Sequence, residues 1–250
     1  MSSSPFKVDE SYLSKHDIVY FSPTQLEAEG FPMGNGNIGG MIWNNDNGIE
    51  LQINKNDLWS KPDKEENDLS VLKHAARLKI DFGIPVFSWI HLKNFEGRLS
   101  LQKGETPYKA ATPYSTTTIR TWLAHDRNVW ILECENLPNE ELTGAEQNAT
   151  VSLERLGSRS FSGWYAGRFP KDPKIGIGKT QSLLNGNDMI IEENGDGLHF
   201  AVACRIIKEP ASPVIINSHR MEQKTVKNKF TVLISVVTDR ENKAPVEAAR

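Results

Sequence analysis

The chain has 250 residues, of which 38% are hydrophobic and 24% are charged. This composition is typical of a soluble globular protein and argues against a largely disordered chain. The 29 Lys and Arg residues nearly balance the 32 Asp and Glu residues, which leaves no electrostatic footprint for nucleic acid or for an anionic membrane. The longest apolar run, Phe230 to Val237, is far shorter than the ~20 residues of a membrane helix. We therefore expect neither nucleic acid nor a membrane as a partner.

Hydrophobic residues recur at every second position along most of the chain, which is the period of a β-strand. Glycine and asparagine clusters, which tolerate the backbone of tight turns, separate these runs at residues 46–48, 185–188 and 194–197. A helix is indicated only weakly, at residues 68–73. In chain order, strands are predicted at residues 41–43, 49–53, 76–82, 119–123, 129–132, 189–191, 198–207 and 230–237.

These patterns predict an all-β fold with little helix, a large antiparallel β-sandwich. We expect the sandwich to cover residues 14–240. Residues 1–13 are predicted to be a flexible tail, and residues 241–250 lose the alternation and resemble a linker.

Two glycine-containing motifs suggest nucleotide binding, and neither has the context that this chemistry needs. The segment from Gly34 to Gly39 matches G-x-G-x-x-G, but it runs into a predicted strand instead of the helix that would meet a pyrophosphate. Gly178-Lys179-Thr180 resembles the end of a P-loop, but Pro173 occupies the position of the first glycine.

No metal ligands stand at characteristic spacings among the six histidines and two cysteines. Cys134 and Cys204 each lie inside an apolar run and are predicted to be buried free thiols. We therefore expect no metal and no cofactor.

Tryptophan is frequent, with six residues, and its large ring can pack in a core or stack on a sugar. Trp122 and Trp130 lie in apolar strands and are expected in the core. Trp59 and Trp164 lie in polar surroundings and are candidates for sugar stacking.

Two sequence blocks carry a resemblance to a known family. The first runs from Phe31 to Trp43 and contains Gly34-Asn35-Gly36-Asn37, and the second runs from Glu50 to Ser60 and contains Asn54-Lys55-Asn56-Asp57-Leu58-Trp59. In order and spacing they resemble the N-terminal region of glycoside hydrolase family 95, the α-L-fucosidase-like enzymes. They also resemble uncharacterised sandwich domains that precede such catalytic barrels.

The resemblance implies an N-terminal β-sandwich of the supersandwich type, followed in the parent protein by a C-terminal (α/α)6 barrel. The barrel supplies the catalytic residues of an inverting mechanism, so no catalytic residue transfers to this chain. The implied partners are that barrel and a glycan substrate. Relatives of this kind are commonly exported, but no signal peptide is visible in this chain, and the compartment stays open.

The loop Gly34-Asn35-Gly36, called the G-N-G loop here, has two interpretations. It can face the barrel and shape the edge of the substrate cleft, with Gly34, Asn35, Gly36, Asn37, Asn54 and Trp59 as interface candidates, or it can be a tight turn stabilised within the sandwich.

The leading expectation is a non-catalytic domain that supports the cleft of a glycoside hydrolase and is inactive alone. The alternatives are a free-standing carbohydrate-binding module and a purely structural interaction domain.

Overall fold

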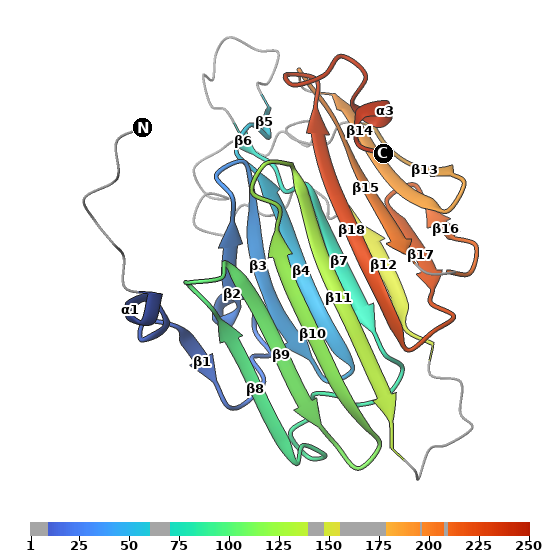
Figure 1. Cartoon of the computed structure of the whole chain (residues 1–250). Coiled ribbons are helices and arrows are strands. Elements are labelled where there is room, and N and C mark those ends of the chain that lie inside the picture. Colours follow the sequence, from blue (N-terminus) through green and yellow to red (C-terminus); the bar gives the residue numbers. More distant parts are fainter. Residues whose placement is uncertain (1–9, 61–70, 140–147, 156–178, 196, 208–209) are drawn as a thin grey trace, which may run out of the picture.

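The computed structural model is nearly all β and is built from two large antiparallel sheets that lie one behind the other (Figure 1). It describes residues 10–60, 71–139, 148–155, 179–195, 197–207 and 210–250. The predicted β-sandwich is therefore confirmed. Trp164 and residues 68–70, the first half of the segment with the weak helix signal, lie outside the described residues. The end of that segment, Val71–Leu72, is strand β6 instead of helix.

One sheet has nine strands, in the spatial order β1-β8-β9-β10-β11-β18-β15-β14-β13. Its strands, in chain order, are β1 (Ile18–Tyr20), β8 (Asn94–Leu99), β9 (Glu105–Ala111), β10 (Ser115–Leu123), β11 (Val129–Pro138), β13 (Lys179–Asn185), β14 (Asp188–Gly195), β15 (Leu198–Ile207) and β18 (Lys229–Thr238).

The second sheet has seven strands, in the order β16-β17-β12-β7-β4-β3-β2. Its strands are β2 (Phe31–Gly34), β3 (Ile38–Asn45), β4 (Gly48–Lys55), β7 (Ala76–Asp81), β12 (Thr150–Glu154), β16 (Val214–Asn217) and β17 (Arg220–Lys224). A separate pair joins β5 (Trp59–Ser60) to β6.

Helical structure is short in the described part of the chain. It consists of α1 (Glu10–Ser14), the 3₁₀ turn η1 (Glu27–Glu29) and α3 (Pro245–Ala248). None of these helices is long and apolar enough to cross a membrane.

The main core lies between the two sheets and follows from the alternation read in the sequence. On β18, every second side chain from Phe230 to Val236 is buried, and the residues between them are partly exposed. Aromatic rings join the two layers at several points. The ring centre of Phe31 in β2 lies 5.7 Å from that of Tyr108 in β9. The ring centre of Phe82, next to β7, lies 6.4 Å from that of Phe230 in β18. Burial of these large side chains is the main force that holds the layers together.

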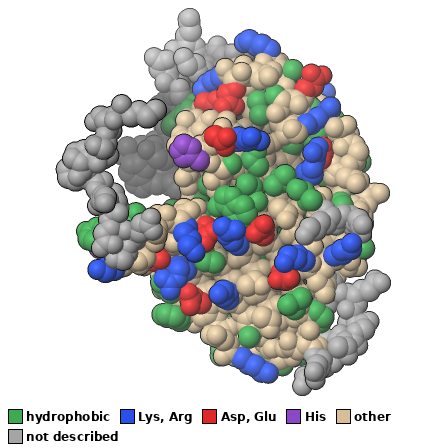
Figure 2. All heavy atoms as spheres, in the orientation of Figure 1, with side chains coloured by type: hydrophobic (Ala, Val, Ile, Leu, Met, Phe, Trp, Pro, Cys, Tyr) green, Lys and Arg blue, Asp and Glu red, His purple; other side chains and the backbone are tan. Residues whose placement is uncertain are grey.

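The face of the nine-stranded sheet that is turned away from the core, here called the outer face, carries a second, smaller apolar cluster. Ile190, Ala201 and Ala203 are buried there beneath Val246 and Ala249 of the C-terminal segment. Helix α3 therefore packs on β15 and β18, and residues 245–249 are part of the folded structure. In Figure 2, hydrophobic side chains gather near the middle of the visible face, with acidic and basic side chains around them.

Candidate functional site

At one end of the sandwich, the turn between β2 and β3, which belongs to the first sequence block, lies close to the loop between β10 and β11 (Figure 1). Asn35 connects them. Its Oδ1 accepts from the backbone N–H groups of Asn37 and Ile38, at 3.0 and 2.9 Å, and so shapes the turn. Its Nδ2 donates to the carbonyl oxygens of Ala124 and Arg127, at 2.9 and 3.1 Å. One side chain thus fixes the turn and ties the two sheets together.

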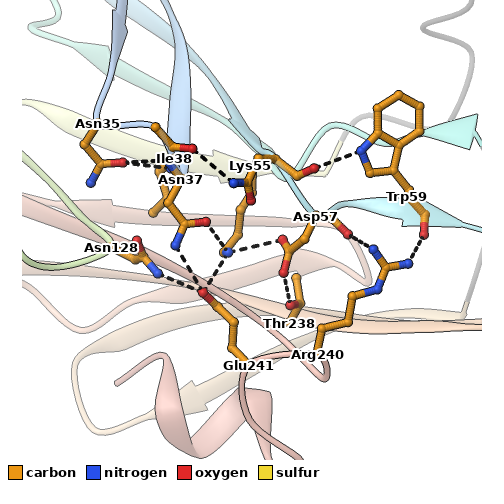
Figure 3. Close-up of polar contacts among 12 residues, drawn as sticks. Asn35, Asn37, Ile38, Lys55, Asp57, Trp59, Asn128, Thr238, Arg240 and Glu241 are labelled. Carbon is orange, nitrogen blue, oxygen red and sulfur yellow. Dashed lines mark hydrogen bonds and ion pairs between the residues drawn. The ribbon is translucent and has the colours of Figure 1, made fainter.

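Asn37 and Lys55 form the centre of this polar network (Figure 3). The side chain of Lys55 is only 1% exposed, because Lys55 shares the inward face of β4 with Leu51 and Ile53. Its ammonium group donates to Asn37 Oδ1 at 2.7 Å and pairs with Glu241 Oε1 at 2.8 Å and Asp57 Oδ1 at 3.1 Å. One amide oxygen and two carboxylates surround the ammonium group, so the buried positive charge is compensated.

The segment after β18 closes the network from the other side. Glu241 Oε1 accepts from Asn37 Nδ2 at 3.2 Å and from Asn128 Nδ2 at 3.0 Å. Arg240 donates to the carbonyl oxygens of Asp57 and Trp59, at 2.8 and 2.7 Å. Residues 240–241 are therefore held against both sequence blocks.

Trp59 lies at the edge of this network, with 40% of its surface exposed. Its Nε1 donates to the carbonyl oxygen of Asn56 at 2.8 Å, which fixes the ring, and Figure 3 shows the indole pointing away from the other labelled side chains. One part of the ring stays open to solvent. Its role in sugar stacking stays a prediction.

The glycines of the first block differ in what surrounds them. Gly36 has a φ of 90° and is exposed, and a Cβ there would meet nothing within 4 Å. Gly34 is also exposed, and its Cβ would make only ordinary contacts. Gly40 is different, since a Cβ there would lie 1.8 Å from the Gln52 carbonyl oxygen. Gly36 therefore serves the left-handed turn, whereas Gly40 serves strand packing.

Asn54 is the one described site candidate that the structure separates from this network. It points to the opposite face of β4 from Lys55, where its Oδ1 accepts from His74 Nδ1 at 2.8 Å. Burial lowers the pKa of His74, and the positive charge of Arg155 lowers it further. Trp164 lies outside the described residues.

A second buried ionic cluster was not anticipated from the sequence. Glu193 is 2% exposed and accepts from Lys73 Nζ at 2.8 Å and from Arg155 Nε at 2.7 Å. The alternation of β14 could have predicted that Glu193 is buried, because Glu193 follows the buried Met189 and Ile191 at every second position. The carboxylate of Glu193 therefore links β14 to Lys73, which follows β6, and to Arg155, which follows β12.

Acid and base chemistry also has little support at the network itself. Its two carboxylates, Asp57 and Glu241, both pair with Lys55, and Asp57 Oδ2 additionally accepts from Thr238 Oγ1 at 2.5 Å. Among the described residues, no group of three His, Cys, Asp or Glu side chains is placed to hold a metal ion. The arrangement is suited to fixing loops in place.

Comparison with solved structures finds the same fold in a much longer protein. A kojibiose phosphorylase from the human microbiome is similar over 93% of this chain and 34% of its own length, with a TM-score of 0.52 and 12% identity. A bacterial glucoamylase, solved with acarbose, matches over 93% of this chain and 37% of its own, with a TM-score of 0.39 and 8% identity. This chain thus spans about a third of the length of either protein.

Comparison with sequences places the chain in a family. No curated protein matches it. A family model described as a domain of unknown function, DUF5703, in its N-terminal part, matches residues 19–169, and this span contains both sequence blocks. Because the match covers more than half of the 250 residues, the chain belongs to the DUF5703 N-terminal domain family.

Proposed function

We propose that this chain acts as a non-catalytic N-terminal β-sandwich domain of a glycoside hydrolase, and that it supports the substrate cleft of a separate catalytic domain. The network around Lys55 carries the proposal. The two sequence blocks that resemble the fucosidase-like enzymes are joined there, and their polar side chains are occupied by contacts within the sandwich. Among the described residues of the network, both carboxylates, Asp57 and Glu241, are engaged in contacts within the sandwich.

The fold similarity supports the same role. The kojibiose phosphorylase shares this architecture over only 34% of its length, so a sandwich of this type occurs beside other domains in a protein named for a sugar reaction. The finer assignment, an α-L-fucosidase-like inverting enzyme with an (α/α)6 barrel, rests on the sequence blocks alone. In that mechanism an acid and an activated water act on opposite sides of the glycosidic bond, and both would belong to the barrel.

An assay with aryl glycosides tests the non-catalytic role. We expect the purified 250-residue chain to hydrolyse none of a panel that includes α-L-fucoside and α-L-galactoside. A longer product of the same locus is expected to hydrolyse at least one of them. A mock purification from cells without the gene controls for host glycosidases. Turnover by the 250 residues alone would contradict the proposal.

The tip of the G-N-G loop is the part of this end that can approach a cleft, because Gly36 is exposed and open space surrounds its Cα. Gly36→Asn keeps a backbone that tolerates positive φ and adds a side chain at the tip. In the longer product we expect this change to raise KM several-fold with kcat little changed. Gly186→Asn, in the turn between β13 and β14, is the matched control, since Gly186 also has positive φ and open surroundings. Equal KM values for both variants would show that the tip does not border the cleft.

A free-standing carbohydrate-binding module is the second candidate, and the exposed indole of Trp59 favours it. Binding of a glycan by the isolated chain, lost in Trp59→Ala, would support this alternative. A purely structural interaction domain would show neither binding nor an effect of Gly36→Asn on KM.

A further inference from the structure

The outer face of the nine-stranded sheet carries a trough that is separate from the network around Lys55. Its volume is about 320 Å³, and it crosses four neighbouring strands, β9, β10, β11 and β18. Helix α3 covers the part of the outer face over β14, β15 and the far end of β18, whereas the trough is open. Four strands at the usual spacing span about 14 Å, which is enough for a short oligosaccharide.

Strand register arranges the outward side chains of the trough in rows that run across the strands. One row consists of Lys109, Thr118, Glu135 and Lys229, and the next consists of Pro107, Arg120, Glu133 and Thr231. A third row, about 7 Å further along the strands, borders the trough with Trp122, Ile131 and Leu233, and Glu105 occupies its end on β9. Polar rows thus lie beside three neighbouring apolar side chains, a combination that suits a ligand with both hydroxyl groups and apolar C–H faces.

Several polar groups of the trough are fixed in position. Arg120 Nε donates to Glu105 Oε2 at 2.5 Å, and its guanidinium lies 4.6 Å from the centre of the Trp122 ring. Lys229 pairs with Glu135 at 3.3 Å. Arg120, which contacts both a carboxylate and a ring, loses less conformational entropy on binding a ligand than a free arginine would, whereas Lys229, 65% exposed, forms only a surface pair.

Other polar groups of the trough are available. Within the described part of the chain, the hydroxyl groups of Thr118 and Thr231 and the ammonium group of Lys109 make no hydrogen bond or ion pair. Donors and acceptors are therefore both present and unoccupied in the trough.

The charge of the trough selects the ligand class. Its three cations, Lys109, Arg120 and Lys229, face the carboxylates of Glu133 and Glu135, and Glu105 offsets Arg120. An anionic ligand would meet two carboxylates, a cationic ligand would meet three cations, and an apolar ligand would bury all of these charges without partners. A neutral ligand that both donates and accepts hydrogen bonds fits this balance.

We propose that this trough binds a neutral oligosaccharide laid across β9, β10, β11 and β18. The choice of a sugar as the neutral ligand rests on the proposed function, in which the chain belongs to a glycan-degrading enzyme. The site would hold a glycan chain near the catalytic domain and would itself break no bond.

The test is binding of the intact 250-residue chain to an array of neutral glycans, with calorimetry for each hit and for kojibiose and 2′-fucosyllactose. We expect Kd values between micromolar and millimolar. The double substitution Thr118→Val and Thr231→Val removes two hydroxyls and keeps side-chain shape, so at least a tenfold loss of affinity is expected. Thr116→Val is the matched control, because Thr116 is an exposed threonine on the same face of β10 outside the trough. Its affinity should be unchanged.

Three results would overturn the proposal. They are the absence of any neutral glycan that binds, full affinity in the double variant, and affinity that collapses between 50 mM and 500 mM NaCl, which would indicate a charged ligand. Lys109→Gln provides a second variant if the double variant melts early, and a loss of affinity of several-fold is expected. Turnover by the isolated chain would defeat the proposed function, yet it would leave the comparison between the Thr118/Thr231 and Thr116 variants unaffected.

Discussion

At the scale of single residues, the buried ammonium group of Lys55 explains why the two sequence blocks occur together. The first block supplies Asn37 and the second supplies Lys55 and Asp57. The carboxylate of Glu241 arrives from a position 204 residues after Asn37. Removal of the charged centre leaves two carboxylates without their partner, and the cost is moderated because Asp57 and Glu241 are partly exposed to water.

We predict that Lys55→Met lowers the free energy of unfolding by about 2 kcal/mol. Urea denaturation, followed by tryptophan fluorescence, measures the loss. Lys79→Met is the control, because Lys79 is 42% exposed and lies 4.0 Å from Asp81, a distance at which a surface pair contributes little. Equal effects of the two substitutions would mean that the network around Lys55 does not stabilise the fold.

His74 makes stability depend on pH in a defined direction. Its pKa is lowered in the folded protein, mainly by burial, so the folded state takes up the proton at lower pH than the unfolded state. The stabilising contribution is complete above the ordinary pKa of 6.5 and is lost as the pH falls through the lower, folded value.

His74→Gln is therefore expected to reduce the loss of stability between pH 7.5 and pH 5. Thermal unfolding at both pH values gives the change in melting temperature for each protein. The difference between these two changes removes the contribution of carboxylates that titrate in both proteins. His125→Gln, which removes an exposed histidine from the loop between β10 and β11, is the control for the loss of one imidazole. An unchanged slope in His74→Gln would show that His74 titrates alike in both states.

At the scale of elements, the hairpin of β3 and β4 depends on a residue without a side chain. The strands pair from Ile38 and Lys55 to Asn45 and Gly48, and Gly40 lies where the Gln52 carbonyl and the Trp130 ring approach the backbone. A methyl group at this position would force the strands apart.

We expect Gly40→Ala to cost 3 kcal/mol or more, or to prevent folding, since backbone must move to relieve the clash. Gly36→Ala, four residues earlier, should cost only about 1 kcal/mol, because the strain there is confined to a positive φ in open space. Melting temperatures of the two variants decide the matter. A smaller loss in Gly40→Ala than in Gly36→Ala would contradict the packing role of Gly40.

The sequence predicted the elements well where one physical rule determines them. Period-two alternation located β7, β10, β11, β15 and β18, and the Asn-Gly turns located the ends of β3, β4, β13 and β14. The same rule also separates two tryptophans. Trp122 pairs with Ile131, so it must point to the opposite face from Trp130, and only Trp130 is fully buried. The expectation that both lie in the core was wrong for Trp122.

The candidate site was predicted less completely, because its residues come from segments that are far apart in the sequence. Asn35, Asn37 and Trp59 were singled out from the blocks, but Lys55 was not, although it shares the parity of the buried Leu51 and Ile53. No local pattern shows that Arg240 and Glu241 return to this end, because this contact depends on the order of strands in the sheet. Residues 241–250, expected to be a linker, include α3, which packs on β15 and β18, and a role in connection to another domain stays a prediction.

At the scale of the whole molecule, two cysteines report on the integrity of the sandwich. Cys134 of β11 and Cys204 of β15 flank β18 from either side and are 2% and 0% exposed. Burial raises the pKa of both thiols far above the ordinary range, and the thiolate is the reactive form.

We predict that neither thiol of the native protein reacts with an aromatic disulfide reagent at pH 8, and that both react together once the chain unfolds. The measurement compares two rates in moderate urea. One is the rate at which the reagent releases its aromatic thiolate, and the other is the unfolding rate from fluorescence. Earlier reaction of one thiol would indicate local opening of its strand and would contradict a single cooperative unit.

The position of β18 also governs when the protein can fold during its synthesis. It is the last of the described strands in chain order, yet it lies in the interior of the nine-stranded sheet, between β11 and β15. Until the ribosome has made residues 229–238, the sheet consists of two separate parts. One part ends at β11 and contains β1, β8, β9 and β10, and the other ends at β15 and contains β14 and β13. The edge of β11, which ends at Pro138, stays unpaired while the ribosome adds about 100 residues up to Thr238, which at about 5–20 residues per second takes roughly 5–20 s. The edge of β15, which ends at Ile207, is unpaired for the last part of this interval, and both edges are then open to other nascent chains. Chaperone protection of the emerging chain therefore matters most immediately before β18 appears.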